Sequence, residues 1–503
     1  MNKPLSFGET TCGDLALIVR PLLRKSLVAF GLLIALGIAW MAINHSRGLG
    51  AFLLVGVGGL LPWYAWTTAR RPGLPLAPIL GIQTLLFYAT PLLVQNPMLS
   101  RHSNEAINAI ALEVFLFGLA IALGWMFATR SIIYADRPAY HRFGFLGGEG
   151  TAKLSLLGPV LLGGSAAFLL LNQMRLLQVV IPANAFSIAR AVADAAGIGG
   201  GLLGGYFASI GALRGVLRVV FWTLLVSHCL LTIYNYTLFP ATSLLIAMLI
   251  GSFLGRGRLP VIPLVLIALL FSFFNLSKFE MRKRYWMEGT AYAAQELSDL
   301  PTRMTEWAEL SWRSLTIEVD PDDLELAPEK QSLSDRVNNL ANLLEARDAM
   351  VTQGVKPYGG GSYTIIPVLF IPRMLWPEKP RTHEGMVALN IHFGRQTRED
   401  SLVTYISWGL LPEAYANFGP IIGALLCGLF LGAGAGALEF WGRPFPFTSL
   451  EALIFLSLSV QIGTSFEMVA SVWLTSIFQM IVALICGTIF FVRKYRAPKP
   501  VSS

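Results

Sequence analysis

Long apolar stretches alternate with short polar connections over most of the chain. A membrane-spanning helix needs about 20 mostly apolar residues, and a search with that length predicts about twelve such helices. They lie near residues 26–44, 49–68, 75–94, 106–128, 154–172, 197–213, 218–237, 240–254, 259–276, 419–441, 447–466 and 470–492. The boundaries between 173 and 258 are the least defined. The pattern predicts an all-α protein with nine helices in 1–275, a large, mostly helical loop in 276–418, and three helices with a basic tail in 419–503.

The composition agrees with this pattern. Hydrophobic residues make up 54% and charged residues 14% of the 503 positions, and the mean hydropathy is +0.59. Soluble domains carry about 25% charged residues. We therefore expect an integral membrane protein that crosses the bilayer many times.

The positions of Lys and Arg predict the orientation, because these residues gather in short loops on the cytoplasmic side. With a cytoplasmic N-terminus, the inner segments hold nineteen of the 38 Lys and Arg residues, against four in the short outer loops: Arg47, Arg101, Arg175 and Arg190. The other fifteen lie between Lys278 and Arg398. Both termini are thus predicted to be cytoplasmic and the large loop to lie outside. The same bias explains most of the net charge of +8, so nucleic acid is not expected as a partner.

The large loop opens with a basic segment that follows the ninth predicted helix directly. A helix through this segment would hold Arg282, Lys283 and Arg284 near the outer headgroups, beside Tyr285 and Trp286. Aromatic residues of this kind are typical of the membrane interface. The segment is either an interfacial anchor or part of a ligand site.

A second helix is predicted further along the loop. Ser334 is a plausible helix cap, and one apolar face is formed by residues that recur at helical spacing: Leu333, Val337, Leu340 and Leu344. Arg336 lies off that face, where it is either a solvated residue or part of a site. The run from Tyr358 to Tyr363 contains three consecutive Gly residues, which either turn the chain or expose backbone donors to phosphate.

The most informative segment is Phe370-Ile-Pro-Arg-Met-Leu-Trp-Pro-Glu-Lys-Pro-Arg381. Its Pro residues remove backbone donors and exclude a regular helix. We expect a bent, restrained backbone that is anchored by Phe370, Leu375 and Trp376 and presents three cations: Arg373, Lys379 and Arg381. An Arg fork can bind two oxygens of one phosphate, whereas Lys supplies a compact charge. The alternative is that the neighbouring acids Glu378 and Glu384 simply pair with these cations.

Glu413 and two polar neighbours, Tyr415 and Asn417, lie just before the tenth predicted helix. A carboxyl group partly removed from water has a raised pKa and can serve as a general base. The alternative is that Glu413 caps a helix or forms a salt bridge within the loop. His392 and His383 are alternative bases, because the ordinary pKa of His is nearer neutrality.

Two of these segments, Pro372 to Pro380 and Glu413 to Gly419, resemble fragments of the Wzy-type O-antigen and oligosaccharide repeat-unit polymerases of bacterial envelopes. The fragments are Pro-Arg-x-x-Trp-Pro-x-Lys-Pro and Glu-x-Tyr-x-Asn-Phe-Gly. The Gly-Gly-Ser run, Arg336 and the predicted topology extend the resemblance. Some members also carry Arg, ten residues and Gly in two outer loops, a weak pattern matched by two pairs, Arg190 with Gly201 and Arg398 with Gly409.

The resemblance implies a fold related to the GT-C membrane glycosyltransferases. It also implies an enzyme that joins undecaprenyl-diphosphate-linked oligosaccharide units at the periplasmic face of the bacterial inner membrane, without a metal or another cofactor. The implied partners are these glycans, membrane lipid, and a chain-length regulator and a flippase of the same pathway. Nucleotides are absent outside the cell, so a donor there must carry its own leaving group. No group of His, Asp and Glu has convincing metal-ligand spacing.

The resulting hypothesis is en bloc transfer of a growing chain from one undecaprenyl diphosphate to a new lipid-linked unit, with inversion. Arg373 and Lys379 would stabilise the departing diphosphate, and Glu413 would accept the acceptor proton. The further substrate-binding candidates are Arg381, Arg282, Arg284, Arg336, Tyr415, Asn417, His392, Arg398 and Arg190.

Two other classes stay open. An O-antigen ligase would pass the polymer to lipid A core, and ligases typically place a His in the large loop before a late helix. This chain has Glu413 at the comparable place, and His392 keeps the ligase open. A lipid-linked oligosaccharide flippase would show ionisable residues in mid-membrane and internal repeats. Four ionisable residues, Glu113, His228, Glu451 and Glu467, lie in or beside the predicted spans, and we expect them either to be satisfied within the helix bundle or to snorkel to the membrane surface. The sugar, the linkage, the polymer and the oligomeric state are not encoded in these patterns.

Overall fold

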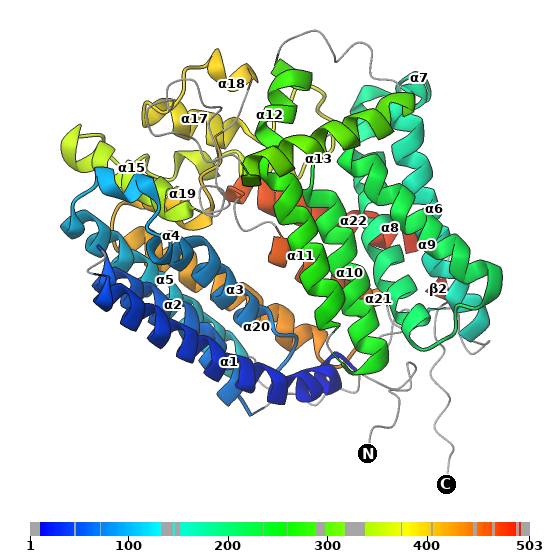
Figure 1. Ribbon diagram of the computed structural model, residues 1–503, viewed down its shortest axis with the longest axis horizontal. Helices are drawn as coiled ribbons and strands as arrows, with labels where there is room; N and C mark the ends of the chain where they lie inside the picture. The colour runs from blue at the N-terminus through cyan, green and yellow to red at the C-terminus, as the bar shows by residue number, and fades with distance from the viewer. Residues whose placement is uncertain are drawn as a thin grey trace. The chain divides into compact units, whose positions relative to one another are not determined.

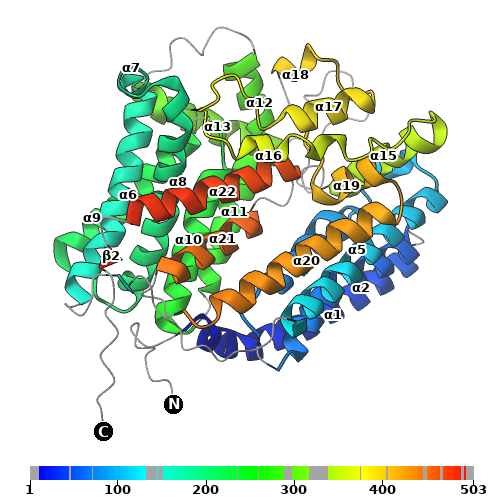
Figure 2. The ribbon, with the colours of Figure 1, turned by 180° about the vertical axis from the view of Figure 1, so that it is seen from behind.

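The apolar stretches fold as helices (Figures 1 and 2). The computed structural model describes residues 11–44, 47–70, 72–131, 144–145, 151–234, 236–258, 260–287, 297–316, 338–373, 375–403, 406–445, 450–464, 468–488 and 492–493. Within these ranges the only strands are β1 (Gly144–Phe145) and β2 (Val492–Arg493), a two-residue antiparallel pair. The predicted all-α class is therefore confirmed.

The described residues fall into two compact units. Unit 1 takes the residues from 151 to 316, and unit 2 takes those before 146 and after 337. This division groups residues by their contacts. The division predicted from the sequence, at residues 275 and 418, instead separates the membrane-spanning helices from the large outer loop, and it stays a prediction.

Unit 1 is a bundle of long helices with a smaller cluster at one end. Its helices are α6 (Thr151–Gln173), α7 (Leu176–Val180), α8 (Ala183–Ser209), α9 (Gly215–Ile233), α10 (Phe239–Arg256), α11 (Val261–Leu276), α12 (Lys278–Arg282) and α13 (Leu300–Thr316). Helix α8 packs against α6 and α10. Trp307 of α13 is fully buried with Tyr236 and Met281, and its indole donates to the carbonyl oxygen of Phe274 at 2.8 Å. The start of the predicted large loop thus folds onto the end of this bundle.

Unit 2 combines the first helices of the chain with the last. It contains α1 (Cys12–Ile43), α2 (Leu49–Thr68), α3 (Leu76–Thr84), α4 (Thr90–Leu93), α5 (Asn104–Ser131), α15 (Asn339–Thr352), α16 (Ile366–Leu369), α17 (Glu384–His392), α18 (Asp400–Val403), α19 (Leu410–Phe418), α20 (Ile422–Gly442), α21 (Leu450–Thr464) and α22 (Ala470–Thr488). A π-helical turn, Leu85–Ala89, joins α3 to α4. The helix predicted after Ser334 is described from Asn339, and its apolar residues Leu340 and Leu344 are fully buried.

Helices α5 and α20 run in parallel and approach closely. A Cβ on Gly432 of α20 would collide with the carbonyl oxygen of Ile121 in α5, and one on Gly124 would lie 2.5 Å from the carbonyl oxygen of Leu429. Small residues permit such close contact between membrane helices. This packing fixes the register of α20, which is separated from α19 by three residues.

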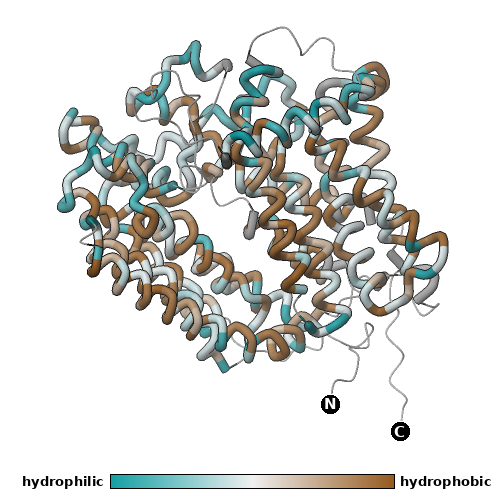
Figure 3. Tube along the Cα trace, viewed as in Figure 1, coloured by the Kyte–Doolittle hydropathy of each residue, from teal (hydrophilic) through white to brown (hydrophobic). Residues whose placement is uncertain are grey.

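Nine helices among the described residues are long and apolar enough to cross a membrane. A tenth span results if α11 and the segment Lys278–Tyr285, which meet at 55°, are taken as one. The last two predicted spans fall on α21, which has 15 residues, and on α22, of which the segment Ala470–Ala483 is a shorter apolar helix; neither is among the nine. Figure 3 shows that the long helices are mostly hydrophobic, whereas the short helices of 338–403 carry more hydrophilic residues. The chain is a multi-pass membrane protein, and the number twelve stays a prediction.

Candidate functional site

Glu413 lies at the centre of a buried polar cluster in unit 2. Helix α19 begins after Gly409 and buries its first eight residues, including Glu413 at 0% exposure. One carboxylate oxygen, Oε1, accepts a hydrogen bond from Ser362 Oγ at 2.7 Å, and Oε2 accepts one from the backbone N–H of Ala470 at 2.6 Å. Burial raises the pKa of Glu413 to about 7, although both hydrogen bonds act in the opposite direction.

The Gly-rich run packs against the same helix. The N–H groups of Tyr358 and Gly359 donate to the carbonyl oxygens of Ala416 and Asn417, at 3.0 and 2.8 Å. Gly359 and Gly360 adopt φ angles of 66° and 85°, a left-handed region that favours glycine. The run is therefore a turn that satisfies the last carbonyls of α19, and these two donors do not face a phosphate.

Ser362 and Asn417 complete this cluster. Asn417 Nδ2 donates to Ser362 Oγ at 2.8 Å and to the carbonyl oxygen of Glu413 at 2.8 Å. Both residues are fully buried. Asn417, predicted as a substrate-binding residue, thus positions the hydroxyl group that contacts Glu413.

The first turn of α22 links Glu413 to the residue that follows the Pro-rich segment. Ala470 donates its backbone N–H to Glu413, and the next residue, Ser471, donates its hydroxyl to the carbonyl oxygen of Thr382 at 2.9 Å. Thr382 directly follows the Pro-rich segment that ends at Arg381. Two consecutive residues of one helix therefore hold segments that lie about 30 residues apart in the chain.

Arg373 and Lys379 brace the Pro-rich segment from within. Arg373 donates through Nη1 to the carbonyl oxygen of Pro377 at 3.0 Å and through Nη2 to that of Pro380 at 3.4 Å. Lys379 Nζ donates to the carbonyl oxygens of Leu369 and Ile371, at 2.7 and 2.5 Å. Burial and the neighbouring Arg373 lower the pKa of Lys379. The two cations thus stabilise the turn by hydrogen bonds to its backbone carbonyl oxygens. Among the described residues, neither cation forms an ion pair with Glu378 or Glu384.

The predicted anchors of this segment are partly wrong. Phe370 is an anchor, because its ring packs edge-to-face on Phe478 of α22 with the ring centres 4.9 Å apart. Leu375 and Trp376 are instead 78% and 43% exposed. The cause lies in the turn itself: the carbonyls bind the two cations on its inner side, so the side chains at its tip point away from the protein.

The remaining candidates of unit 2 are dispersed. Arg381 and Arg398 are exposed. His392 is half-buried, and its Nε2 lies 2.8 Å from the carbonyl oxygen of Lys356. His383 is half-buried, and burial lowers its pKa. Neither His is hydrogen-bonded to Glu413 within the described region.

Tyr415 lies on α19 and is almost fully buried. Burial raises its pKa to about 12, with the Glu113 carboxylate as a further cause. Glu113 of α5 accepts hydrogen bonds from the backbone N–H of Ile421 at 3.0 and 2.8 Å, at a residue with the strained φ of 63°. Glu113 is thus satisfied within the bundle, as expected, and it fixes the junction between α19 and α20.

The other predicted cations do not belong to unit 2. Arg282 Nε donates to the carbonyl oxygen of Tyr236 at 3.1 Å, and Arg284 pairs with Glu280 and Glu306 at 3.0 and 2.9 Å. Arg190 is exposed and lies 3.9 Å from Asp194. All three belong to unit 1, and Arg336 lies outside the described residues. The predicted site is therefore divided: Arg190, Arg282 and Arg284 belong to unit 1, and the other described candidates belong to unit 2.

Sequence reasoning missed Ser362, Ala470 and Ser471 as partners in this cluster. Ser362 follows a Gly run, which is a usable signal. Ala470 acts through its backbone, so no side chain could have revealed it. Within the described ranges, no group of three or more His, Cys, Asp and Glu residues is placed to hold a metal ion. No family model, curated protein or solved structure matches this chain.

Proposed function

We propose that the chain is a membrane glycosyltransferase that joins undecaprenyl-diphosphate-linked oligosaccharide units into a surface polysaccharide at the periplasmic face of the inner membrane. The proposal includes twelve spans and a fold related to the GT-C enzymes. The observation that carries it is the first turn of α22, where Ala470 binds Glu413 and Ser471 binds Thr382, the residue that follows the Pro-rich segment. Glu413 and the C-terminal end of the Pro-rich segment are thereby linked through one helix.

The state of Glu413 supports its role as the general base. Its pKa of about 7 lets the carboxylate form near neutral pH and still accept a proton readily. Both carboxylate oxygens are occupied in this structure, one of them by a hydroxyl group, Ser362 Oγ. In the reaction, the acceptor sugar hydroxyl replaces the Ser362 hydroxyl at Oε1 and gives its proton to Glu413. The oxygen of the acceptor hydroxyl then attacks the anomeric carbon of the donor.

Arg373 is a better candidate than Lys379 for stabilising the departing diphosphate of the donor. A guanidinium group has five N–H donors, and the described residues account for two of them. The others can bind an oxygen of the diphosphate while the loop stays braced. The bond from the anomeric carbon to the diphosphate oxygen breaks, and the electron pair leaves with undecaprenyl diphosphate, whose growing charge the cation stabilises.

The proposal is tested with variants in a strain that lacks the chromosomal copy. Glu413→Gln and Arg373→Gln are expected to abolish the ladder of polymer lengths on gels at unchanged membrane abundance. Arg101→Gln, which removes one exposed positive charge elsewhere, is the control and should restore the ladder. A normal ladder with Glu413→Gln would remove Glu413 from the mechanism.

A further inference from the structure

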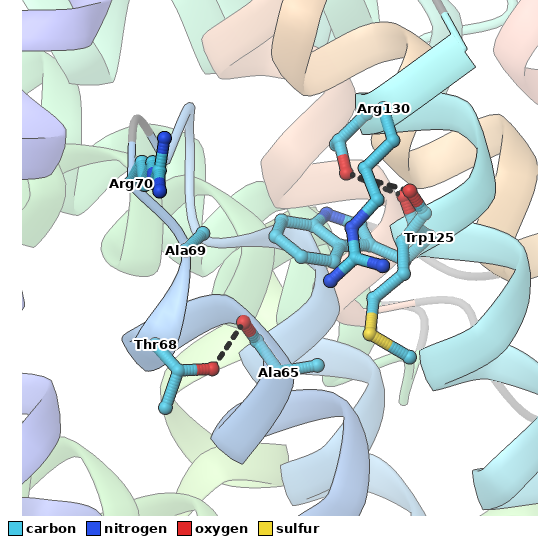
Figure 4. A pocket seen from close by; sticks show the side chains of 8 residues that line it. Ala65, Thr68, Ala69, Arg70, Trp125 and Arg130 are labelled. Atoms are coloured by element: carbon cyan, nitrogen blue, oxygen red, sulfur yellow. Dashed lines mark hydrogen bonds between the residues drawn. The ribbon is translucent and has the colours of Figure 1, made fainter.

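A cavity of about 840 Å³ opens in unit 2 between the last turns of α2 and α5 (Figure 4). It is lined by Ala65, Thr68, Ala69, Arg70, Trp125, Met126, Thr129 and Arg130. Two of these residues are cations, and none is an acid. The nearby Glu439 is fully buried, and its Oε1 accepts hydrogen bonds from the N–H groups of Leu76 and Ala77, both at 3.0 Å.

The cavity lies far from Glu413 along the helix axes. Helices α5 and α20 are parallel: Glu113 meets Ile421, which follows α19, and Trp125 lies against Gly436. Arg130 is therefore about 25 Å along α5 from Glu113 at 1.5 Å per residue, close to the roughly 30 Å of a bilayer core. The cavity thus lies near the opposite membrane surface, on the predicted cytoplasmic side.

The positively charged hydrogen-bond donors among the residues that line the cavity are the two arginines. The hydroxyl groups of Thr68 and Thr129 donate to carbonyls of their own helices, at 3.0 Å to Tyr64 and 2.8 Å to Trp125. Arg70 and Arg130 are exposed, and within the described ranges neither donates to another residue. Figure 4 shows Arg70, which follows α2, and Arg130, in the last turn of α5, among the residues that line the cavity. Two arginine forks on one cavity favour an anion with several oxygens.

Two further arginines add to the positive potential beside the cavity. Arg20 donates to the carbonyl oxygens of Thr67 and Ala69, and Arg24 donates to that of Thr67. These bonds engage carbonyls at the end of α2, next to Ala69 in the cavity wall. Their charges remain, and they raise the attraction for an anion at this end of the unit.

Apolar side chains that flank the cavity indicate the source of the anion. Tyr64 of α2 and Phe127 of α5 are 60% and 71% exposed, and each is adjacent in sequence to a residue that lines the cavity. In a membrane protein such faces contact acyl chains. We propose that this cavity binds the phosphate group of an anionic phospholipid through Arg70 and Arg130, with the acyl chains against Tyr64 and Phe127.

The test is lipid binding by the purified full-length protein in detergent. Native mass spectrometry with added phosphatidylglycerol measures the affinity for the first retained lipid. The double variant Arg70→Gln/Arg130→Gln is expected to bind at least about tenfold more weakly, because two charge-assisted contacts are lost. The matched control is Arg256→Gln/Arg258→Gln, which removes two exposed charges from another predicted inner segment and should bind like the natural protein.

Two further arms make the result decisive. Arg70→Lys/Arg130→Lys keeps the charges and should retain more binding than the Gln pair, which separates anion binding from a folding defect. Inorganic phosphate is titrated in parallel: binding of free phosphate that needs both arginines, with no retained lipid, would overturn the lipid source. Equal lipid affinity in the natural protein and the Gln pair, or an equal loss in the control pair, would overturn the site itself.

Discussion

Replacement of Glu413 separates its structural contribution from its proposed chemical one. In Glu413→Ala, the buried Ser362 Oγ and the partly buried N–H of Ala470 lose their acceptor. An unsatisfied buried donor costs about 1–3 kcal/mol, and the deleted side chain leaves a cavity in addition. We expect Glu413→Ala to lower the free energy of unfolding by at least about 3 kcal/mol.

Glu413→Gln keeps the shape and both contacts. Its Oε1 can accept from the N–H of Ala470, and its Nε2 can donate to Ser362 Oγ, which already accepts from Asn417 and has a second lone pair. This reverses the direction of the hydrogen bond between Ser362 and residue 413, as protonation of the Glu413 carboxyl group also does at pH 5. This variant should therefore lie within about 1 kcal/mol of the natural protein at pH 5, while polymer formation is lost. The two variants would have similar activity defects but very different stability.

The pH dependence of stability gives a second, independent readout. The folded-state pKa of Glu413 is about 7, against an ordinary value of 4.5. Between these values the folded protein keeps a proton that the unfolded chain has lost, so stability falls as the pH rises. The protonated Glu413 carboxyl group contributes its full stabilisation below pH 4.5. At about 1.4 kcal/mol per pKa unit, the shift corresponds to about 3 kcal/mol of unfolding free energy, which is lost as the pH rises to 7 and above. Glu413→Gln lacks this titration and should be more stable than the natural protein at pH 8.

The assay is unfolding in detergent, followed by intrinsic fluorescence from pH 5 to 8, for the natural protein and the two Glu413 variants. A Gln variant as unstable as the Ala variant at pH 5 would contradict the hydrogen-bond assignment. A natural protein whose stability does not change over this range, relative to the Gln variant, would contradict the burial of a carboxyl group that takes up a proton near pH 7.

Three further predictions follow from the packing of unit 2. Gly432→Ala should lower the free energy of unfolding in detergent by about 2 kcal/mol or more, because the new Cβ would collide with α5. Gly434→Ala on the same helix places a Cβ where no atom lies within 4 Å, so it should be neutral or slightly stabilising. Equal effects of the two substitutions would contradict the α5–α20 register. Arg373→Gln should expose the Pro-rich turn to limited proteolysis, because one amide cannot reach both carbonyls, while Arg101→Gln should leave the cleavage pattern unchanged. Ser471→Ala should lower stability by about 1 kcal/mol through loss of one hydrogen bond, and no change would argue against the contact with Thr382.

The long helices could be predicted because each membrane span needs a continuous apolar stretch, a property that is local in the sequence. The burial of Leu340 and Leu344 was likewise visible from helical spacing. The distribution of these helices between two units could not be predicted from the sequence. It depends on helix pairs such as α5 and α20, which are more than 290 residues apart. Close contact at single glycines carries no periodic signal.

The candidate site was only partly predictable for a related reason. Glu413 and Asn417 could be identified from residue type and resemblance, yet the partner of Glu413 at Ala470 is a backbone group. The roles of Arg373 and Lys379 depend on which carbonyls the turn presents to them, and a sequence of Pro residues restricts the backbone without fixing its direction. Leu375 and Trp376 are exposed because of the direction that the backbone takes in this turn, whereas their hydrophobicity alone predicts that they are buried.

Polymerisation of lipid-linked units is tested most directly by mass spectrometry of the glycans attached to undecaprenyl diphosphate in a strain that lacks this protein. The account predicts that single repeat units accumulate at the outer face, that the natural protein converts them to chains, and that Glu413→Gln leaves them as single units. Accumulation of finished polymer on the lipid, as expected for loss of a ligase, or of single units confined to the inner face, as expected for loss of a flippase, would contradict it.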